Sequence, residues 1–118
     1  MIVTRTHILG GWRLHHVEEL HDDNTITEPF TAVDGGLAYL QSGEVIVAWG
    51  GDAHFNAYFG NFELDTPAGI IRHRVRGGYN RGANGTVLVR KITVDGDVLT
   101  LTRDGDLPRL RLTWLRAR

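Results

Sequence analysis

Short stretches of alternating apolar and polar residues recur along the chain, and clusters of Gly, Asp and Asn separate them. Alternation with a period of two, in segments rich in Val, Ile, Leu and Thr, predicts β-strands. The predicted strands are residues 9–21, 25–32, 36–41, 44–49, 57–65, 69–76, 85–94, 97–103 and 108–116. No window has a convincing helical period. The best helix candidate is 52–59, which would form roughly one or two turns.

Many short strands at regular spacing are typical of a β-sandwich or β-barrel. The clearest hairpin turn is Asp95-Gly96-Asp97, and Pro29 makes segment 25–32 an edge strand or an irregular link. A closed barrel of eight strands leaves no exposed edge and can hold one small ligand. We therefore predict an all-β fold, a small antiparallel up-and-down barrel of about eight strands with little helix, in a single domain over residues 1–118.

The composition excludes several kinds of chemistry. There is no Cys, so neither disulfides nor a Cys-based zinc site is expected. No His-Glu-x-x-His, P-loop or Gly-x-Ser-x-Gly motif occurs, and the only serine, Ser42, falls in a predicted turn. We expect no metal and no cofactor. Because no signal peptide and no apolar run of membrane-spanning length is found, we expect a cytoplasmic protein with no membrane contact.

The net charge of −1 conceals an asymmetry along the chain. Residues 1–71 hold ten acidic and two basic residues, a net charge of −8, whereas residues 72–118 hold eleven basic and four acidic residues, a net charge of +7. In one domain, the two halves are expected to face each other and partly neutralise. The near-zero total argues against nucleic acid as a partner.

Strand alternation predicts which side chains point into the barrel. If Trp12 points inward, so do His16 and Glu18. One face of the strand 69–76 carries three arginines and is expected to face solvent, so His73, on the other face, is expected to point inward. In the strand 85–94, Arg90 is predicted to point inward together with Ile92. A buried Arg90 needs a charged partner, so we expect it to meet Glu18 or a ligand anion across the cavity.

Several segments resemble the bacterial lipocalin-like domain family, whose barrels belong to the calycin type. The first strand begins with Gly11-Trp12-Arg13-Leu14, like the glycine-tryptophan opening of calycin barrels. The other segments that carry the resemblance are 36–40, 42–45, 58–65, 72–75, 89–90, 95–101 and 112–114. The resemblance implies a barrel with an internal cavity and a short or absent lid at residues 50–57. It implies no particular reaction.

These residues lead to two functional hypotheses and a structural alternative. In the first, the barrel binds a small, largely apolar molecule and transforms it by cofactor-free proton transfer, as an isomerase, cyclase or lyase. In the second, the barrel is a non-catalytic carrier. In the third, its own side chains fill the cavity and the domain mediates association. A homodimer is possible if Val87 and Val89 are exposed. The candidate acid and base groups are His16 and His73, with Glu18 orienting them; the candidate ligand-binding residues are Arg90, Tyr39, Tyr58, Phe62, Trp114 and His54.

Each candidate also has a purely structural interpretation. Glu18 and Arg90 could form only an ion pair, and His16 and His73 could be satisfied core histidines. Tyr39 and Tyr58 could serve mainly in packing, and His54 could be a loop residue at the barrel mouth. Trp12 is expected to be structural, stacked on an arginine of the final strand.

Overall fold

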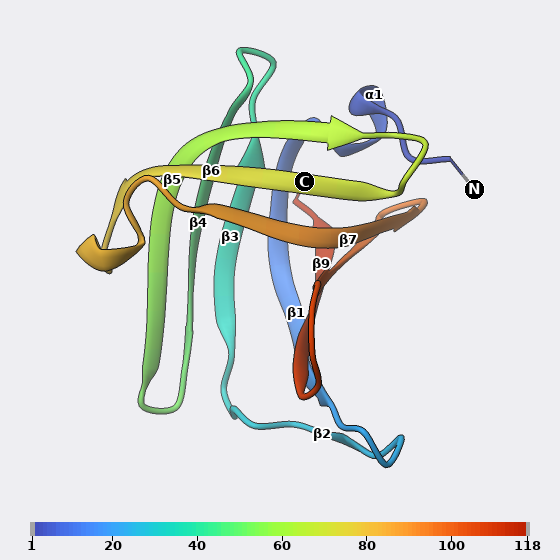
Figure 1. Ribbon diagram of the computed structural model, residues 1–118, viewed down its shortest axis with the longest axis vertical. Helices are drawn as coiled ribbons and strands as arrows, with labels where there is room; N and C mark the ends of the chain where they lie inside the picture. Colours follow the sequence, from blue (N-terminus) through green and yellow to red (C-terminus); the bar gives the residue numbers. More distant parts are fainter. Residues whose placement is uncertain (1, 118) are drawn as a thin grey trace.

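The computed structural model describes residues 2–117, which form one antiparallel sheet closed into a barrel (Figure 1). Eight strands pair in the order β1-β3-β4-β5-β6-β7-β8-β9, and β9 pairs back with β1. The short β2 pairs with the end of β1. The strands are β1 (Gly10–Leu20), β2 (Ile26–Thr27), β3 (Asp34–Tyr39), β4 (Glu44–Gly51), β5 (His54–Asp65), β6 (Ile70–Gly78), β7 (Val87–Asp95), β8 (Val98–Arg103) and β9 (Arg109–Arg116). The predicted all-β barrel is therefore confirmed.

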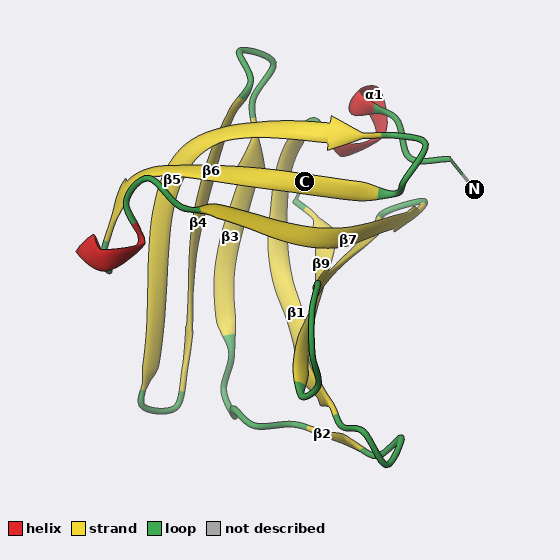
Figure 2. Cartoon of the chain, in the orientation of Figure 1, coloured by secondary structure: helices red, strands yellow, loops and turns green. Residues whose placement is uncertain are grey.

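Within residues 2–117, helix is confined to two short pieces (Figure 2), the α-helix α1 (Arg5–Ile8) and the 3-10 turn η1 (Arg81–Ala83). The best helix candidate, residues 52–59, is not helical. Gly50 and Gly51 pair with Phe55 and His54, so only a two-residue turn separates β4 from β5. Ala53 takes a positive φ of 57° in that turn, and the residues that follow alternate as a strand. The hairpin predicted at Asp95-Gly96-Asp97 is confirmed.

The two ends of the barrel differ in how they are filled. At one end, here called the α1 end, Ile8 is fully buried and accepts a hydrogen bond from the Trp12 indole at 2.9 Å. Arg116 stacks over the Trp12 ring, 4.2 Å from its centroid, as predicted for an arginine of the final strand. The connections 21–33, 52–53, 79–86 and 104–108 gather at the opposite end, here called the cavity end. The packed core thus occupies the α1 end and leaves room toward the other.

A β-bulge in β1 changes which of its residues face inward. Leu14 pairs with Trp114 and His16 with the next residue of β9, Thr113, so His15 is an extra residue in the ladder. After one extra residue, the side chains in the rest of the strand that would have pointed inward point outward, and the reverse. Val17 is buried and faces inward beside Leu112. The prediction that His16 and Glu18 point into the barrel is therefore wrong: both lie on the outer wall.

A second irregularity bends β5, which Figure 1 shows turning from one direction to another along its length. The register with β6 shifts between Phe59 and Gly60. A Cβ atom on Gly60 would collide with the carbonyl oxygen of Arg74, so a glycine is needed for β6 to approach this closely. The bend leaves Tyr58 on the cavity side and Phe62 in the packed core.

Candidate functional site

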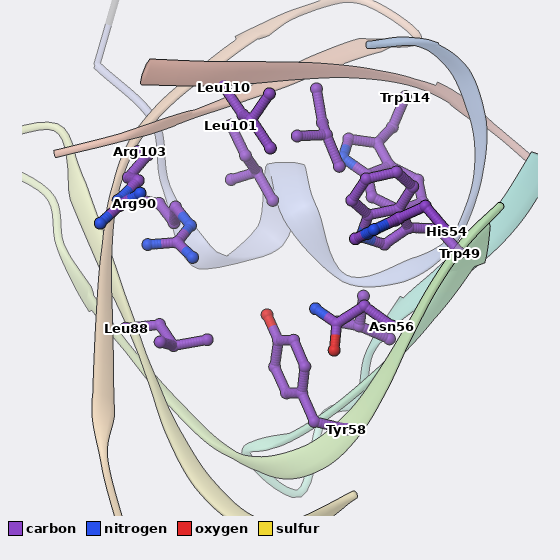
Figure 3. A pocket seen from close by; sticks show the side chains of 12 residues that line it. Trp49, His54, Asn56, Tyr58, Leu88, Arg90, Leu101, Arg103, Leu110 and Trp114 are labelled. Atoms are coloured by element: carbon purple, nitrogen blue, oxygen red, sulfur yellow. The ribbon is translucent and has the colours of Figure 1, made fainter. Parts of the chain in front are cut away.

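A cavity of about 300 Å³ lies inside the barrel, between the sheet strands at the cavity end (Figure 3). Its apolar wall comes from β4, β7, β8 and β9, and its polar groups come from β5, β7 and β8. The lining residues are Val47, Trp49, His54, Asn56, Tyr58, Leu88, Arg90, Leu101, Arg103, Leu110, Leu112 and Trp114. None of them is acidic, so the cavity carries net positive charge.

Two arginines supply that charge. Arg90 and Arg103 are paired across β7 and β8, and Figure 3 shows both on the same side of the cavity. Arg90 is half-buried, and its Nη1 donates to the Val89 carbonyl oxygen at 2.9 Å. Within residues 2–117, no carboxylate forms an ion pair with either guanidinium. Burial lowers the pKa of Arg90 from its ordinary value, and the nearby positive charge of Arg103 acts in the same direction.

Glu18, the predicted partner of Arg90, is bound elsewhere. Its Oε1 accepts from Arg111 Nε at 3.0 Å and from Arg111 Nη2 at 2.8 Å, on the outer wall. His16 lies beside it, with Nε2 3.5 Å from Glu18 and 3.0 Å from Glu28. His16 and Glu18 are thus neighbours, as predicted, but they are not at the cavity. The expected meeting of Glu18 and Arg90 is wrong because the β1 bulge turns Glu18 outward.

His73 points inward, as predicted, and is completely buried. Its Nε2 lies 2.7 Å from the Tyr39 hydroxyl and its Nδ1 lies 2.7 Å from the Tyr58 hydroxyl. Burial, reinforced by the positive charge of Arg90, lowers the pKa of His73 from 6.5 to about 3. The imidazole is therefore neutral at ordinary pH. Only Tyr58 of these three residues lines the cavity, and it separates His73 from the cavity space.

The two tyrosines keep their protons. Burial raises the pKa of Tyr58 to about 12, although the charge of Arg90 opposes part of this shift. Burial also raises the pKa of Tyr39 well above its ordinary value of 10. At neutral pH both hydroxyls can donate a hydrogen bond, and neither can act as an anionic base.

An aromatic cluster forms the opposite side of the cavity. His54 lies 4.6 Å from both the Trp49 and the Phe30 rings, measured between centroids. The His54 Nε2 and Trp114 Nε1 atoms are buried, with no hydrogen-bond partner in residues 2–117. Buried polar atoms of this kind are rare in folded proteins. The apolar and unsatisfied groups on this side suit the body of an organic molecule with a polar substituent.

The predicted ligand-binding residues divide into two groups. Arg90, Tyr58, Trp114 and His54 line the cavity. Tyr39 and Phe62 are buried in the packed core instead, with ring centroids 4.9 Å apart.

The sequence interpretation missed Trp49, Asn56 and Arg103. Alternation could have found Arg103, because it follows Leu99 and Leu101 at a spacing of two and both leucines are buried. Asn56 was missed because the fifth long strand was predicted to begin at residue 57, whereas β5 begins at His54.

No family model and no curated protein sequence matches this chain. In residues 2–117, no helix is both long enough and apolar enough to cross a membrane. No group of three or more His, Asp or Glu side chains in the described part of the chain is placed to hold a metal ion. The site must therefore be interpreted from its own geometry.

Proposed function

We propose that the protein binds a small, partly apolar organic anion inside the barrel. The observation that supports this most directly is Arg90, a half-buried guanidinium that lines the cavity and has no acidic partner within residues 2–117. A buried charge is costly unless it is paired. An anionic group on the ligand would supply the missing partner, and Arg103 would reinforce it.

The volume and the lining narrow the class of ligand. A cavity of about 300 Å³ is at the small end of the range for ligand sites. Leu88, Leu101 and Leu110 offer an apolar surface, and Trp49 and Trp114 offer flat aromatic faces. A molecule with a single ring and one acidic group would match this site better than a long fatty acid would.

Binding is favoured over proton-transfer catalysis. His16 and Glu18, two of the three candidate catalytic residues, lie on the outer wall. The third, His73, is neutral and separated from the cavity by Tyr58. We therefore prefer the carrier alternative to an isomerase, cyclase or lyase, and the cavity argues against an interior filled by side chains. Eight-strand closure supports the lipocalin-like resemblance, which remains part of the proposal.

Arg90→Met tests the proposal directly. Native mass spectrometry of the purified protein is expected to reveal a bound small acid, released on denaturation. A titration with 3-phenylpropanoate, followed by calorimetry and by the fluorescence of Trp49 and Trp114, is expected to show saturable binding. Arg90→Met should weaken it about 10- to 100-fold, because a hydrogen bond to a charged group contributes about 1.5–3 kcal/mol.

Arg74→Met is the matched control, since Arg74 is an exposed arginine on the outer wall of β6. It should bind 3-phenylpropanoate as the wild type does. Equal affinities for wild type and Arg90→Met would overturn the proposal. So would a preference for the uncharged 3-phenylpropanamide over the carboxylate.

A further inference from the structure

The chain Tyr39–His73–Tyr58 fixes the direction of its own hydrogen bonds. Both ring nitrogens of His73 lie 2.7 Å from a tyrosine hydroxyl oxygen. A neutral imidazole has one N–H and one bare nitrogen, so it donates to one tyrosine and accepts from the other. Two arrangements are possible, and they differ in which tyrosine gives its proton to the ring.

Burial selects between them. Tyr39 is completely buried, and its only hydrogen-bond partner in residues 2–117 is His73. If His73 Nε2 carried the hydrogen, the Tyr39 O–H would have no acceptor in a dry environment, which folded proteins avoid. Tyr39 must therefore donate to Nε2, and the hydrogen of His73 resides on Nδ1. Nδ1 then donates to the oxygen of Tyr58.

This leaves the hydrogen of Tyr58 free. Figure 3 shows the Tyr58 hydroxyl pointing into the cavity, and the guanidinium of Arg90 extends into the same space. The Tyr58 oxygen already accepts a hydrogen bond from Nδ1–H of His73. The Tyr58 O–H is therefore available to donate a hydrogen bond to a ligand in the cavity. Tyr58, Arg90 and Arg103 thus all present hydrogen-bond donors to the ligand.

We propose that Tyr58 is a specificity-determining donor, held in that role by the Tyr39–His73 pair, and that Tyr58 and Arg90 together select ligands with an anionic oxygen, such as carboxylates. This inference rests on the proposed function and deepens it. Tyr39 and His73 are positioning residues, since neither lines the cavity. Amines and hydrocarbons of the same size should be rejected, because they leave these donors without an acceptor.

The first experiment needs no ligand. Nitrogen-15 NMR distinguishes a protonated ring nitrogen from a bare one, and His73→Gln identifies the signals of His73. We expect the Nδ1–H tautomer in the wild type. In Tyr39→Phe the bias is removed, so a substantial Nε2–H population should appear. An Nε2–H tautomer in the wild type would overturn this inference alone and leave the proposed function standing.

The second experiment measures affinity for 3-phenylpropanoate. Tyr58→Phe should weaken binding about tenfold, as expected for one lost hydrogen bond to a charged group. Tyr39→Phe should weaken it less than Tyr58→Phe does, because the Tyr58 hydroxyl remains, and should also change the tautomer of His73. Tyr79→Phe is the control, because Tyr79 is 71% exposed, and it should change neither.

The outcomes are distinguishable. Unchanged affinity in Tyr58→Phe, with normal binding by the wild type, would overturn the donor role only. Equal binding of 3-phenylpropanoate and 3-phenylpropylamine would overturn the selection for an anionic oxygen. A wild-type protein that binds no 3-phenylpropanoate would contradict the proposed function as well, whatever the tautomer of His73.

Discussion

The outer and inner walls of the barrel treat charge in opposite ways. On the outer wall, acidic side chains meet basic side chains of other strands, as in Glu18–Arg111 at 2.8 Å and Glu44–Arg76 at 2.9 Å. On the inner wall, Arg90 has no carboxylate partner in residues 2–117. The same residue type is thus neutralised by the protein on one side of the sheet and left for a ligand on the other.

This contrast explains the uneven charge of the two halves of the chain. Glu18, Glu44, Glu63 and Asp65 of the acidic half pair with arginines of the basic half, and they do so on the outer wall. The expected neutralisation between halves is therefore found, but outside the barrel. The positive charge that remains inside is available for a partner that is not part of this chain.

The largest expected effect concerns the buried inner histidine. The pKa of His73 is about 3 when folded and 6.5 ordinarily, so between these values the unfolded chain binds a proton that the folded chain does not. The contribution of neutral His73 to the free energy of unfolding is therefore complete above pH 6.5. Below that pH the free energy of unfolding falls, by up to about 1.4 kcal/mol per pH unit. Urea unfolding between pH 7.5 and 4.5 should show a smaller slope for His73→Gln than for wild type.

The exposed His15 on the outer wall provides the control for that slope. His15→Gln should keep the pH dependence of the wild type. If His73→Gln and His15→Gln had the same slope, the neutral state of the inner histidine would not be what makes the fold acid-sensitive.

The second prediction concerns the stability of the inner wall. Without ligand, Arg90→Met should raise the free energy of unfolding by about 1–2 kcal/mol, because it removes an unpaired charge and keeps an apolar stem. Arg90→Lys keeps the charge and should give no such gain. Chemical denaturation of the ligand-free proteins measures both, and a loss of stability in Arg90→Met would mean that the guanidinium is already compensated.

The third prediction applies the same change to the outer wall. Arg111→Met should lower the free energy of unfolding by about 1 kcal/mol, since it leaves the Glu18 side chain, 19% exposed, without the two hydrogen bonds that Oε1 accepts from Arg111. Affinity for 3-phenylpropanoate should stay the same. The double variant with Glu18→Gln should cost little more than either change alone. A change in ligand affinity would show that the two walls are not independent.

The smallest effect is expected at the most exposed pairs. Glu63 and Arg74 lie 3.9 Å apart, with side chains 70% and 60% exposed. Water and salt screen such a pair almost completely. Glu63→Gln should leave the Tm unchanged within experimental error at 0.15 M salt, and a clear decrease would indicate that outer-wall charges act as a network.

The alternation of apolar and polar residues predicted most strands correctly. It predicted correctly only for some strands which side chains face the inside of the barrel. Alternation placed His73, Arg90 and Trp114 inward because β6, β7 and β9 are regular at those positions. It failed for His16 and Glu18 because a bulge depends on how β1 pairs with β9, about a hundred residues away along the chain. Local alternation contains no information about such a distant register.

The candidate site was predicted in part for the same reason. Arg90, Tyr58, Trp114 and His54 were identified as ligand-binding residues, and all four line the cavity. The hydrogen-bonded chain from Tyr39 through His73 to Tyr58 could not be predicted, since it joins side chains of β3, β6 and β5 that are far apart along the sequence. The predicted Glu18–Arg90 ion pair rested on a valid argument, that a buried cation needs an anionic partner. Glu18 is not that partner, because it binds Arg111 on the outer wall.

The seam between β1 and β9 has a consequence for the order of folding. It joins strands from opposite ends of the described chain, so the entropy of closing this loop makes it a late step in folding. Trp114 and Leu112 belong to that last strand, and the cavity is incomplete until it docks. A molecule that spans Trp114 and Arg90 binds only the closed barrel, so occupancy should prolong the lifetime of the folded state as well as its stability.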